Sequence, residues 1–149
     1  MYYQRRMALA ALPSAAYWAR RHLETTLTDW RATIDVPSAK LIVTELMSNG
    51  VKFSTPLTAH HQVVYGQRPG AVPYDALAQI GYVGLRLSYA SERLLIEVWD
   101  RSERPPLRIA PDREAEGGRG LLMVERLALR WGWYPSSWRG KLVWAEMGE

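Results

Sequence analysis

A carboxylate and an amide placed four residues apart are the side chains of this sequence best suited to chemistry. They are Glu45 and Asn49, in the stretch Leu-Ile-Val-Thr-Glu-Leu-Met-Ser-Asn-Gly-Val-Lys-Phe-Ser over residues 41–54. On an α-helix, side chains four residues apart lie one above the other. Oxygen atoms are the ligands that magnesium prefers, and a carboxylate in such a place can act as a general base. The same pair also fits an ordinary amphipathic helix with a polar flank. Other parts of the chain are therefore needed to distinguish a functional site from a purely structural helix.

Apolar residues around this pair recur at steps of three and four, which predicts a helix with one buried face. They are Ala39, Ile42, Val43, Leu46, Gly50 and Phe53. We expect the helix to follow the break at 35–38, where Asp35 or Ser38 can cap it. It should end near Phe53, because a proline follows at position 56.

A second carboxylate, Asp100, is predicted to point into the core from the end of a strand. Residues 83–89 alternate between apolar and other side chains, 94–99 carry an aliphatic residue at every second position, and a tight turn at 90–92 joins the two segments. This pattern predicts a β-hairpin. With a period of two, Asp100 points to the same side as the apolar residues of the second strand. A buried carboxylate is costly without a partner, and either an adenine amino group or a neighbouring backbone amide would serve.

A glycine-rich stretch, Gly117-Gly118-Arg119-Gly120-Leu121, precedes a run of residues with an apolar helical face. Glycines that open a helix let phosphates approach backbone N–H groups at the positive end of the helix dipole, and Arg119 could add a charged donor. Glycines before a helix are also a common turn, so this motif alone is weak. The segment before it, 101–116, holds three Pro and many charges without periodicity, which predicts a mobile loop.

The remaining patterns complete an α+β fold of about five strands, two long helices early and one helix late. Residues 2–10 can form an opening strand and Ala15 to Trp30 a helix, whereas 130–134 and 141–147 predict a closing hairpin. The segment 56–80 is punctuated by Gly and Pro and gives no clear periodicity beyond one short helical turn near its end.

Length and composition are those of a soluble globular protein. A chain of 149 residues suggests a single domain, and the absence of Cys excludes disulfides and thiolate metal sites. No apolar run approaches a membrane span and the N-terminus lacks a signal-peptide pattern, so a cytoplasmic protein with no membrane partner is expected. The net charge is +4, but the basic residues are scattered along the chain, which disfavours nucleic acid as a partner.

Four stretches in this order resemble the GHKL (Bergerat-fold) ATP-binding superfamily, and most closely its small bacterial branch of anti-sigma-factor serine-protein kinases. Glu45-Leu46-x-x-Asn49 resembles the N-box of that family, and Asp100 through Pro105 its first glycine box, Asp-x-Gly-x-x-Pro. Residues 116–124 resemble the second glycine box, and 140–146 resemble the closing strand.

The resemblance implies a two-layer α/β sandwich, with a mixed, mostly antiparallel sheet and helices on one face. It implies ATP and magnesium as ligands, within one histidine-kinase-like domain covering 1–149. Asn49 would bind the magnesium, Glu45 would be the catalytic base, and Asp100 would read the adenine amino group. The second box would face the phosphates through Gly118 and Gly120 and the N–H groups of the residues that follow, Arg119 and Leu121. Residues 101–116 would form a lid, and 56–80 would be an insertion longer than this branch usually carries.

Two functions follow from the resemblance. The first is ATP-dependent phosphorylation or sequestration of a protein partner, a sigma factor or an anti-anti-sigma-type substrate, in transcriptional regulation; a homodimer is compatible with it. The second is a non-catalytic module in which ATP only orders the lid. Retention of Glu45 favours the kinase. Ser102, where the first box has glycine, and Leu142, where the closing strand usually offers Thr to the adenine, favour the binding module.

Overall fold

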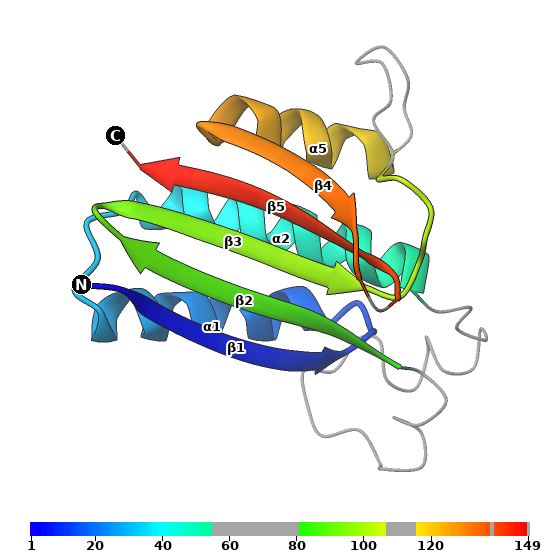
Figure 1. Ribbon diagram of the computed structural model, residues 1–149, viewed down its shortest axis with the longest axis horizontal. Helices are drawn as coiled ribbons and strands as arrows, with labels where there is room; N and C mark the ends of the chain where they lie inside the picture. Colours follow the sequence, from blue (N-terminus) through cyan, green and yellow to red (C-terminus); the bar gives the residue numbers. More distant parts are fainter. Residues whose placement is uncertain (55–80, 107–115, 138, 149) are drawn as a thin grey trace.

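The computed structural model describes residues 1–54, 81–106, 116–137 and 139–148 (Figure 1). The expected insertion at 56–80, and most of the expected lid, lie outside the described residues. The elements in chain order are β1 (Tyr3–Ala10), α1 (Ala15–Asp29), α2 (Val36–Ser54), β2 (Tyr82–Ala90), β3 (Arg93–Asp100), α5 (Glu116–Leu127), β4 (Arg130–Pro135) and β5 (Lys141–Gly148).

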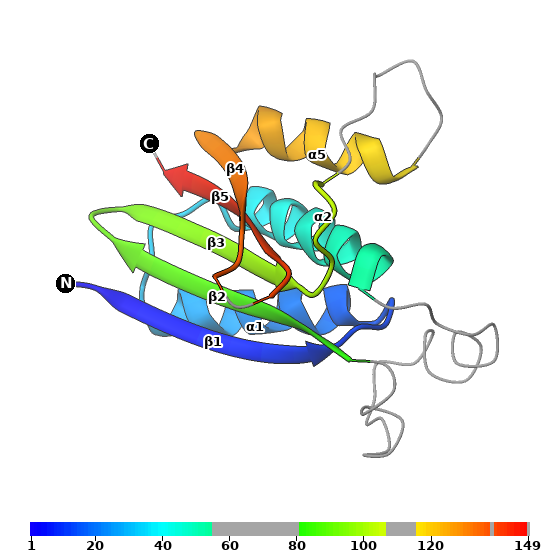
Figure 2. The ribbon, with the colours of Figure 1, turned by 45° about the vertical axis from the view of Figure 1, so that its right-hand side comes forward.

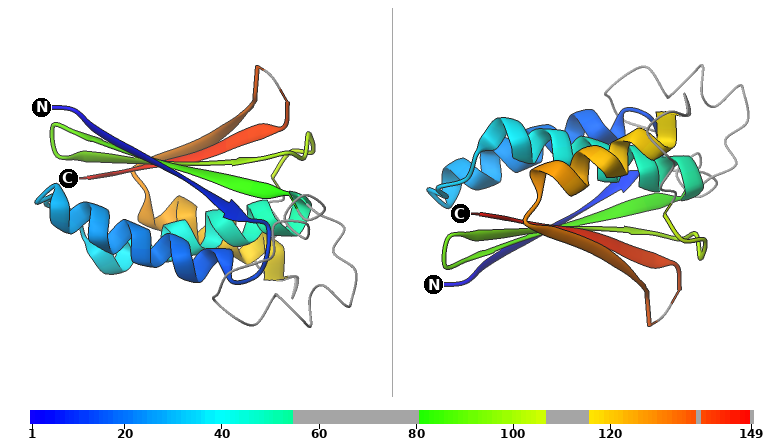
Figure 3. Two further views of the ribbon diagram at one scale, coloured as in Figure 1. Left: turned by 90° about the horizontal axis from the view of Figure 1, so that it is seen from below. Right: turned by 90° about the horizontal axis from the view of Figure 1, so that it is seen from above.

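The strands form one five-stranded sheet in the order β1-β2-β3-β5-β4. Every pairing of neighbours in this sheet is antiparallel, where a mixed, mostly antiparallel sheet was expected. All the helices that the structure describes cover the same face of the sheet (Figure 3). The predicted two-layer α+β architecture is therefore confirmed.

The hairpin of β2 and β3 follows the predicted alternation. Its turn residues Ser91 and Glu92 have φ of 50° and 60°, the left-handed conformation that two-residue hairpin turns with the right strand twist require. The inward side chains of β3 are almost completely buried, and Asp100 is buried with them at 1% exposed. The period of two thus placed this carboxylate on the helix-covered side, as predicted.

Helix α2 lies between α1 and α5 in the helical layer and crosses the middle of the sheet (Figure 2). Its N-terminus has the expected cap, because the Asp35 carboxylate accepts hydrogen bonds from the Ser38 hydroxyl at 2.8 Å and the Ser38 N–H at 3.5 Å. Its apolar face is fully buried at Ala39, Ile42, Val43 and Leu46. The predicted organising helix is confirmed, and it carries Glu45 and Asn49 beside the core.

Glycine at position 50 lets α2 approach the sheet closely. A Cβ atom built on Gly50 would lie 3.1 Å from Val83 Cγ1 and 3.3 Å from Val98 Cγ1, tighter than ordinary van der Waals contact. It would also lie 3.7 Å from Asp100 Cβ. The small residue at this point therefore brings the Asn49 end of α2 next to the end of β3.

No helix in the described ranges is long and apolar enough to cross a membrane.

Candidate functional site

Asn49 has a buried oxygen atom without a hydrogen-bond partner. The residue is 7% exposed, and no described residue donates to its Oδ1. Among the described side chains, His22 Nε2 is the other buried polar atom in this condition. Because a buried acceptor without a donor costs free energy, a native structure keeps one mainly where a ligand, a water or an ion completes it. The Oδ1 of Asn49 is therefore suitably placed to bind a cation.

Glu45 lies one helical turn before Asn49 and is half-buried. Its side chain packs against the backbone of α5 at Gly120. Burial raises the pKa of the Glu45 carboxyl above its ordinary value of 4.5, because desolvation disfavours the charged form. A carboxylate with a raised pKa is a better proton acceptor than one at the surface.

Gly120 leaves room for the Glu45 carboxylate, which would have to move aside for a larger residue. A Cβ atom at position 120 would collide with Glu45 Oε2 and would lie 3.4 Å from Glu45 Cβ. The second glycine box therefore has a packing role that the sequence did not reveal: through Gly120, the N-terminal part of α5 packs against the side chain of Glu45, the predicted base.

Helix α5 begins at Glu116, so the glycines lie inside the helix and not in a turn before it. This corrects part of the expected phosphate site. The N–H groups of the first three residues of an α-helix have no intrahelical partner, and here these residues end at Gly118; the N–H of Arg119 makes the first intrahelical bond. Gly120 and Leu121 come later in the helix, and the Leu121 side chain is in the core at 1% exposed. The side chain of Arg119 lies outside the described residues.

Asp100 already has two partners in the protein. Its Oδ1 accepts a hydrogen bond from the Ser102 N–H at 2.9 Å. The same oxygen forms an ion pair with Lys141 Nζ, which lies 2.8 Å away. Both contacts end on the same oxygen, and no described residue donates to Oδ2, which can accept from a further donor. Burial raises the pKa of the Asp100 carboxyl, while the Lys141 ammonium and the Ser102 N–H act in the opposite direction. The backbone amide anticipated as a partner is present; the lysine was not anticipated.

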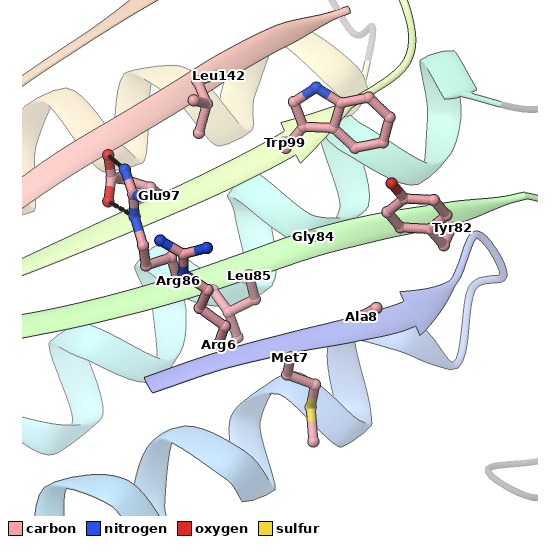
Figure 4. A pocket seen from close by; sticks show the side chains of 10 residues that line it. All are labelled: Arg6, Met7, Ala8, Tyr82, Gly84, Leu85, Arg86, Glu97, Trp99 and Leu142. Carbon is pink, nitrogen blue, oxygen red and sulfur yellow. Dashed lines mark hydrogen bonds and ion pairs between the residues drawn. The ribbon is translucent and has the colours of Figure 1, made fainter. Parts of the chain in front are cut away.

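Leu142 does not face this site, which corrects the role expected for it. Along β5 the side chains of Lys141, Val143 and Ala145 are buried against the helices, and Leu142 points to the other face of the sheet. There it lines a hollow of about 450 Å³ with Trp99 and the Arg86–Glu97 ion pair (Figure 4). The residue of β5 that reaches Asp100 is Lys141, so the absence of Thr at 142 does not change the surroundings of Asp100.

Ser102, the second departure, has a local structural role. Its N–H donates to Asp100, and its hydroxyl oxygen accepts a hydrogen bond from the Arg104 N–H at 3.2 Å. A serine hydroxyl bonded to the backbone two residues on is a common way to shape a turn. The serine therefore fixes the path of the chain as it leaves β3.

Sequence reasoning missed Lys141, although the signal was present. The alternation that predicted the closing strand puts 141 on the same side as the apolar residues 143, 145 and 147. A lysine on the inward side of a strand needs a buried partner. Asp100 was the carboxylate already predicted to point to that side.

Among the residues that the structure describes, no group of three or more His, Cys, Asp or Glu side chains comes together to hold a metal ion. Magnesium is often held by one or two protein oxygen atoms together with the phosphates of a nucleotide. The buried Oδ1 of Asn49 is compatible with that mode of binding.

No protein-family model matches the sequence, and no curated protein matches it either.

Proposed function

We propose that this protein binds magnesium-ATP between α2, the end of β3 and the start of α5, and transfers the terminal phosphoryl group to a partner protein. The observation that carries the proposal is the buried Oδ1 of Asn49, to which no described residue donates a hydrogen bond. Around it, Gly50 of the same helix packs against Asp100, and Glu45 packs against Gly120. Residues from three separate stretches of the sequence thus meet along one and a half turns of α2.

Asp100 supports the adenine side of the proposal. Its Oδ2, to which no described residue donates, would accept a hydrogen bond from the 6-amino group of adenine, whereas the 6-oxo group of guanine has no proton to offer it. Because the carboxylate is 1% exposed, a donor from the ligand would bind it with little competition from water.

Asn49 and the N-terminus of α5 support the phosphate side. The amide oxygen of Asn49 would be the protein ligand of the cation, and the N–H groups of the first turn of α5 that have no intrahelical partner would donate to the phosphates. The buried acceptor on α2 is an observation independent of the helix terminus, and both belong to elements that pack on each other.

Glu45 is the group proposed to accept the proton of a substrate hydroxyl. Bound magnesium-ATP would supply the phosphoryl group, and positioning with electrostatic stabilisation carries most of such a transfer. The class of substrate follows from the motif resemblance: a Ser-bearing regulatory protein of the anti-anti-sigma type, with a sigma factor as the partner held or released.

One observation favours the non-catalytic alternative, in which ATP controls the partner without phosphate transfer. The Glu45 carboxylate is crowded by the backbone of Gly120, which restricts its access to a substrate. Turnover in the presence of a partner protein separates the two functions, because both require ATP binding and only the kinase requires Glu45 as a base.

The binding proposal predicts that Asn49→Ala removes the magnesium dependence of ATP affinity. The wild type should bind ATP much more tightly with magnesium than with EDTA, because the Asn49 oxygen holds the cation that bridges the phosphates. Calorimetry of both proteins under both conditions measures this. Ser48→Ala, an exposed neighbour on the same helix, is the matched control and should behave as the wild type. Equal affinities for all three proteins in both conditions would exclude Asn49 as the cation ligand.

A further inference from the structure

We propose that Lys141 is a positioning residue for base recognition: it holds Asp100 by Oδ1 and so leaves only Oδ2 to meet the base. The inference rests on the proposed ATP site and adds to it the residue that fixes its specificity. Lys141 would touch no ligand atom and would act entirely through the carboxylate.

Lys141 and Asp100 form a buried ion pair with a well-defined geometry. The Lys141 and Asp100 side chains are 1% and 2% exposed, and Nζ lies 2.8 Å from Oδ1. Lys141 Nζ also lies 3.5 Å from the Ser102 carbonyl oxygen, while the Ser102 N–H donates to the same Oδ1. The lysine therefore holds both the carboxylate and the first residues after β3.

Contacts of the β4–β5 turn place Lys141 next to Asp100. Gly140 has a φ of +74°, and a Cβ atom there would collide with the Asp100 carbonyl oxygen. On the other face of the sheet, Trp99 Nε1 donates to the Arg139 carbonyl at 2.8 Å. These contacts fasten the turn to the end of β3, so Lys141 enters β5 directly opposite Asp100.

The ammonium group decides which hydrogen bonds Asp100 can make. Burial alone favours the neutral acid, which can donate as well as accept; the ionised form accepts only. Among the described residues, the groups that face Asp100 are the Lys141 ammonium from β5, the Ser102 N–H, and the uncharged Gly50 of α2, with the uncharged Asn49 beside it; Glu45 lies one turn further back on α2. Lys141 is thus the cation that keeps the carboxylate an acceptor and makes it select a 6-amino purine.

The test compares ATP with inosine triphosphate, whose base has a 6-oxo group, at about pH 6 and about pH 8, which bracket neutrality. The wild type should prefer ATP equally at both pH values. In Lys141→Met the Asp100 carboxyl should take up a proton at the lower pH and donate to the 6-oxo group. The preference for ATP should then fall about tenfold at the lower pH, the effect of one discriminating hydrogen bond.

Two further variants separate positioning from folding. Lys141→Arg keeps a cation beside Asp100 and should restore the pH-independent preference. Asp100→Asn/Lys141→Met leaves no unpaired buried charge and should fold even if Lys141→Met does not. Because the new amide does not titrate, the double variant should prefer ATP over inosine triphosphate only weakly, and this preference should not change with pH. A double variant that still selects ATP as strongly as the wild type would overturn the inference.

A measurement without nucleotide keeps this inference distinct from the proposed function. Carbon-13 NMR titration of the Asp100 carboxyl in the ligand-free protein should show a higher pKa in Lys141→Met than in the wild type. If the wild type binds no ATP but this difference is present, the proposed function fails while the control of Asp100 by Lys141 stands. If the wild type binds ATP and Lys141→Met changes neither the carboxyl pKa nor the base preference, Lys141 is not a positioning residue.

Discussion

Glu45→Gln is expected to bind ATP as the wild type does and to lose phosphate transfer by about a hundred- to ten-thousand-fold, the usual contribution of a general base. The glutamine keeps the shape that packs under Gly120, so α5 should stay in place. Its neutral amide cannot accept the proton of a substrate hydroxyl. Radiolabelled ATP turnover with candidate partner proteins, beside equilibrium binding on the same samples, gives both readouts.

Stability provides the control for this variant. Because the pKa of Glu45 is raised in the folded protein, ionisation costs more in the folded state than in the unfolded one. The wild type therefore loses stability as the pH rises through the folded pKa, and Glu45→Gln does not. The variant should be at least as stable as the wild type at neutral pH and no more stable below the ordinary pKa of 4.5. Loss of turnover together with loss of stability would mean misfolding; full turnover in a stable variant would show that Glu45 is not the base.

Lys141→Met should lower the free energy of unfolding by about 3–5 kcal/mol, the range for breaking a buried ion pair on one side. The methionine fills the space of the lysine stem but leaves Asp100 buried without its cation. Urea unfolding, followed by tryptophan fluorescence, measures the change.

Two control variants show whether the unpaired charge of Asp100 causes the loss of stability in Lys141→Met. Lys40→Met removes a lysine from an ion pair with Glu24 whose side chains are 36% and 48% exposed, so its effect should stay within about 1 kcal/mol. Asp100→Asn/Lys141→Met removes both buried charges and should recover most of the lost stability. If Lys141→Met costs no more than Lys40→Met, the pair is not a significant source of stability.

The parts of the fold that sequence predicted well are those with a strict local period. Alternation in β3 placed Asp100 on the inner side, and the three- and four-residue steps of α2 placed Glu45 and Asn49 beside the core. Both follow from geometry that neighbouring residues share. The capping of α2 by Asp35 is local in the same way.

The parts that were missed depend on contacts between distant segments. Three glycines within four residues disfavour a helix, so α5 was expected to begin after them. Gly120 of that helix packs on Glu45, 75 positions earlier in the numbering, and no local pattern shows this contact. Lys141 was likewise overlooked because its significance comes from Asp100 on another strand, and the motif resemblance drew attention to Leu142 instead. The insertion of β5 between β3 and β4 cannot be read from any single segment.

The most direct test of the proposed site is paramagnetic broadening in the NMR spectrum of labelled protein with ATP and manganese in place of magnesium. The cation should broaden the Asn49 side-chain amide most, then the backbone signals of Glu45 and Gly120, all around the same point of the structure. Arg86 and Trp144, on the opposite face of the sheet, should keep their line widths. Strong broadening on that outer face with an unaffected Asn49, or no broadening at all with ATP in excess, would contradict the placement of magnesium-ATP between α2, β3 and α5.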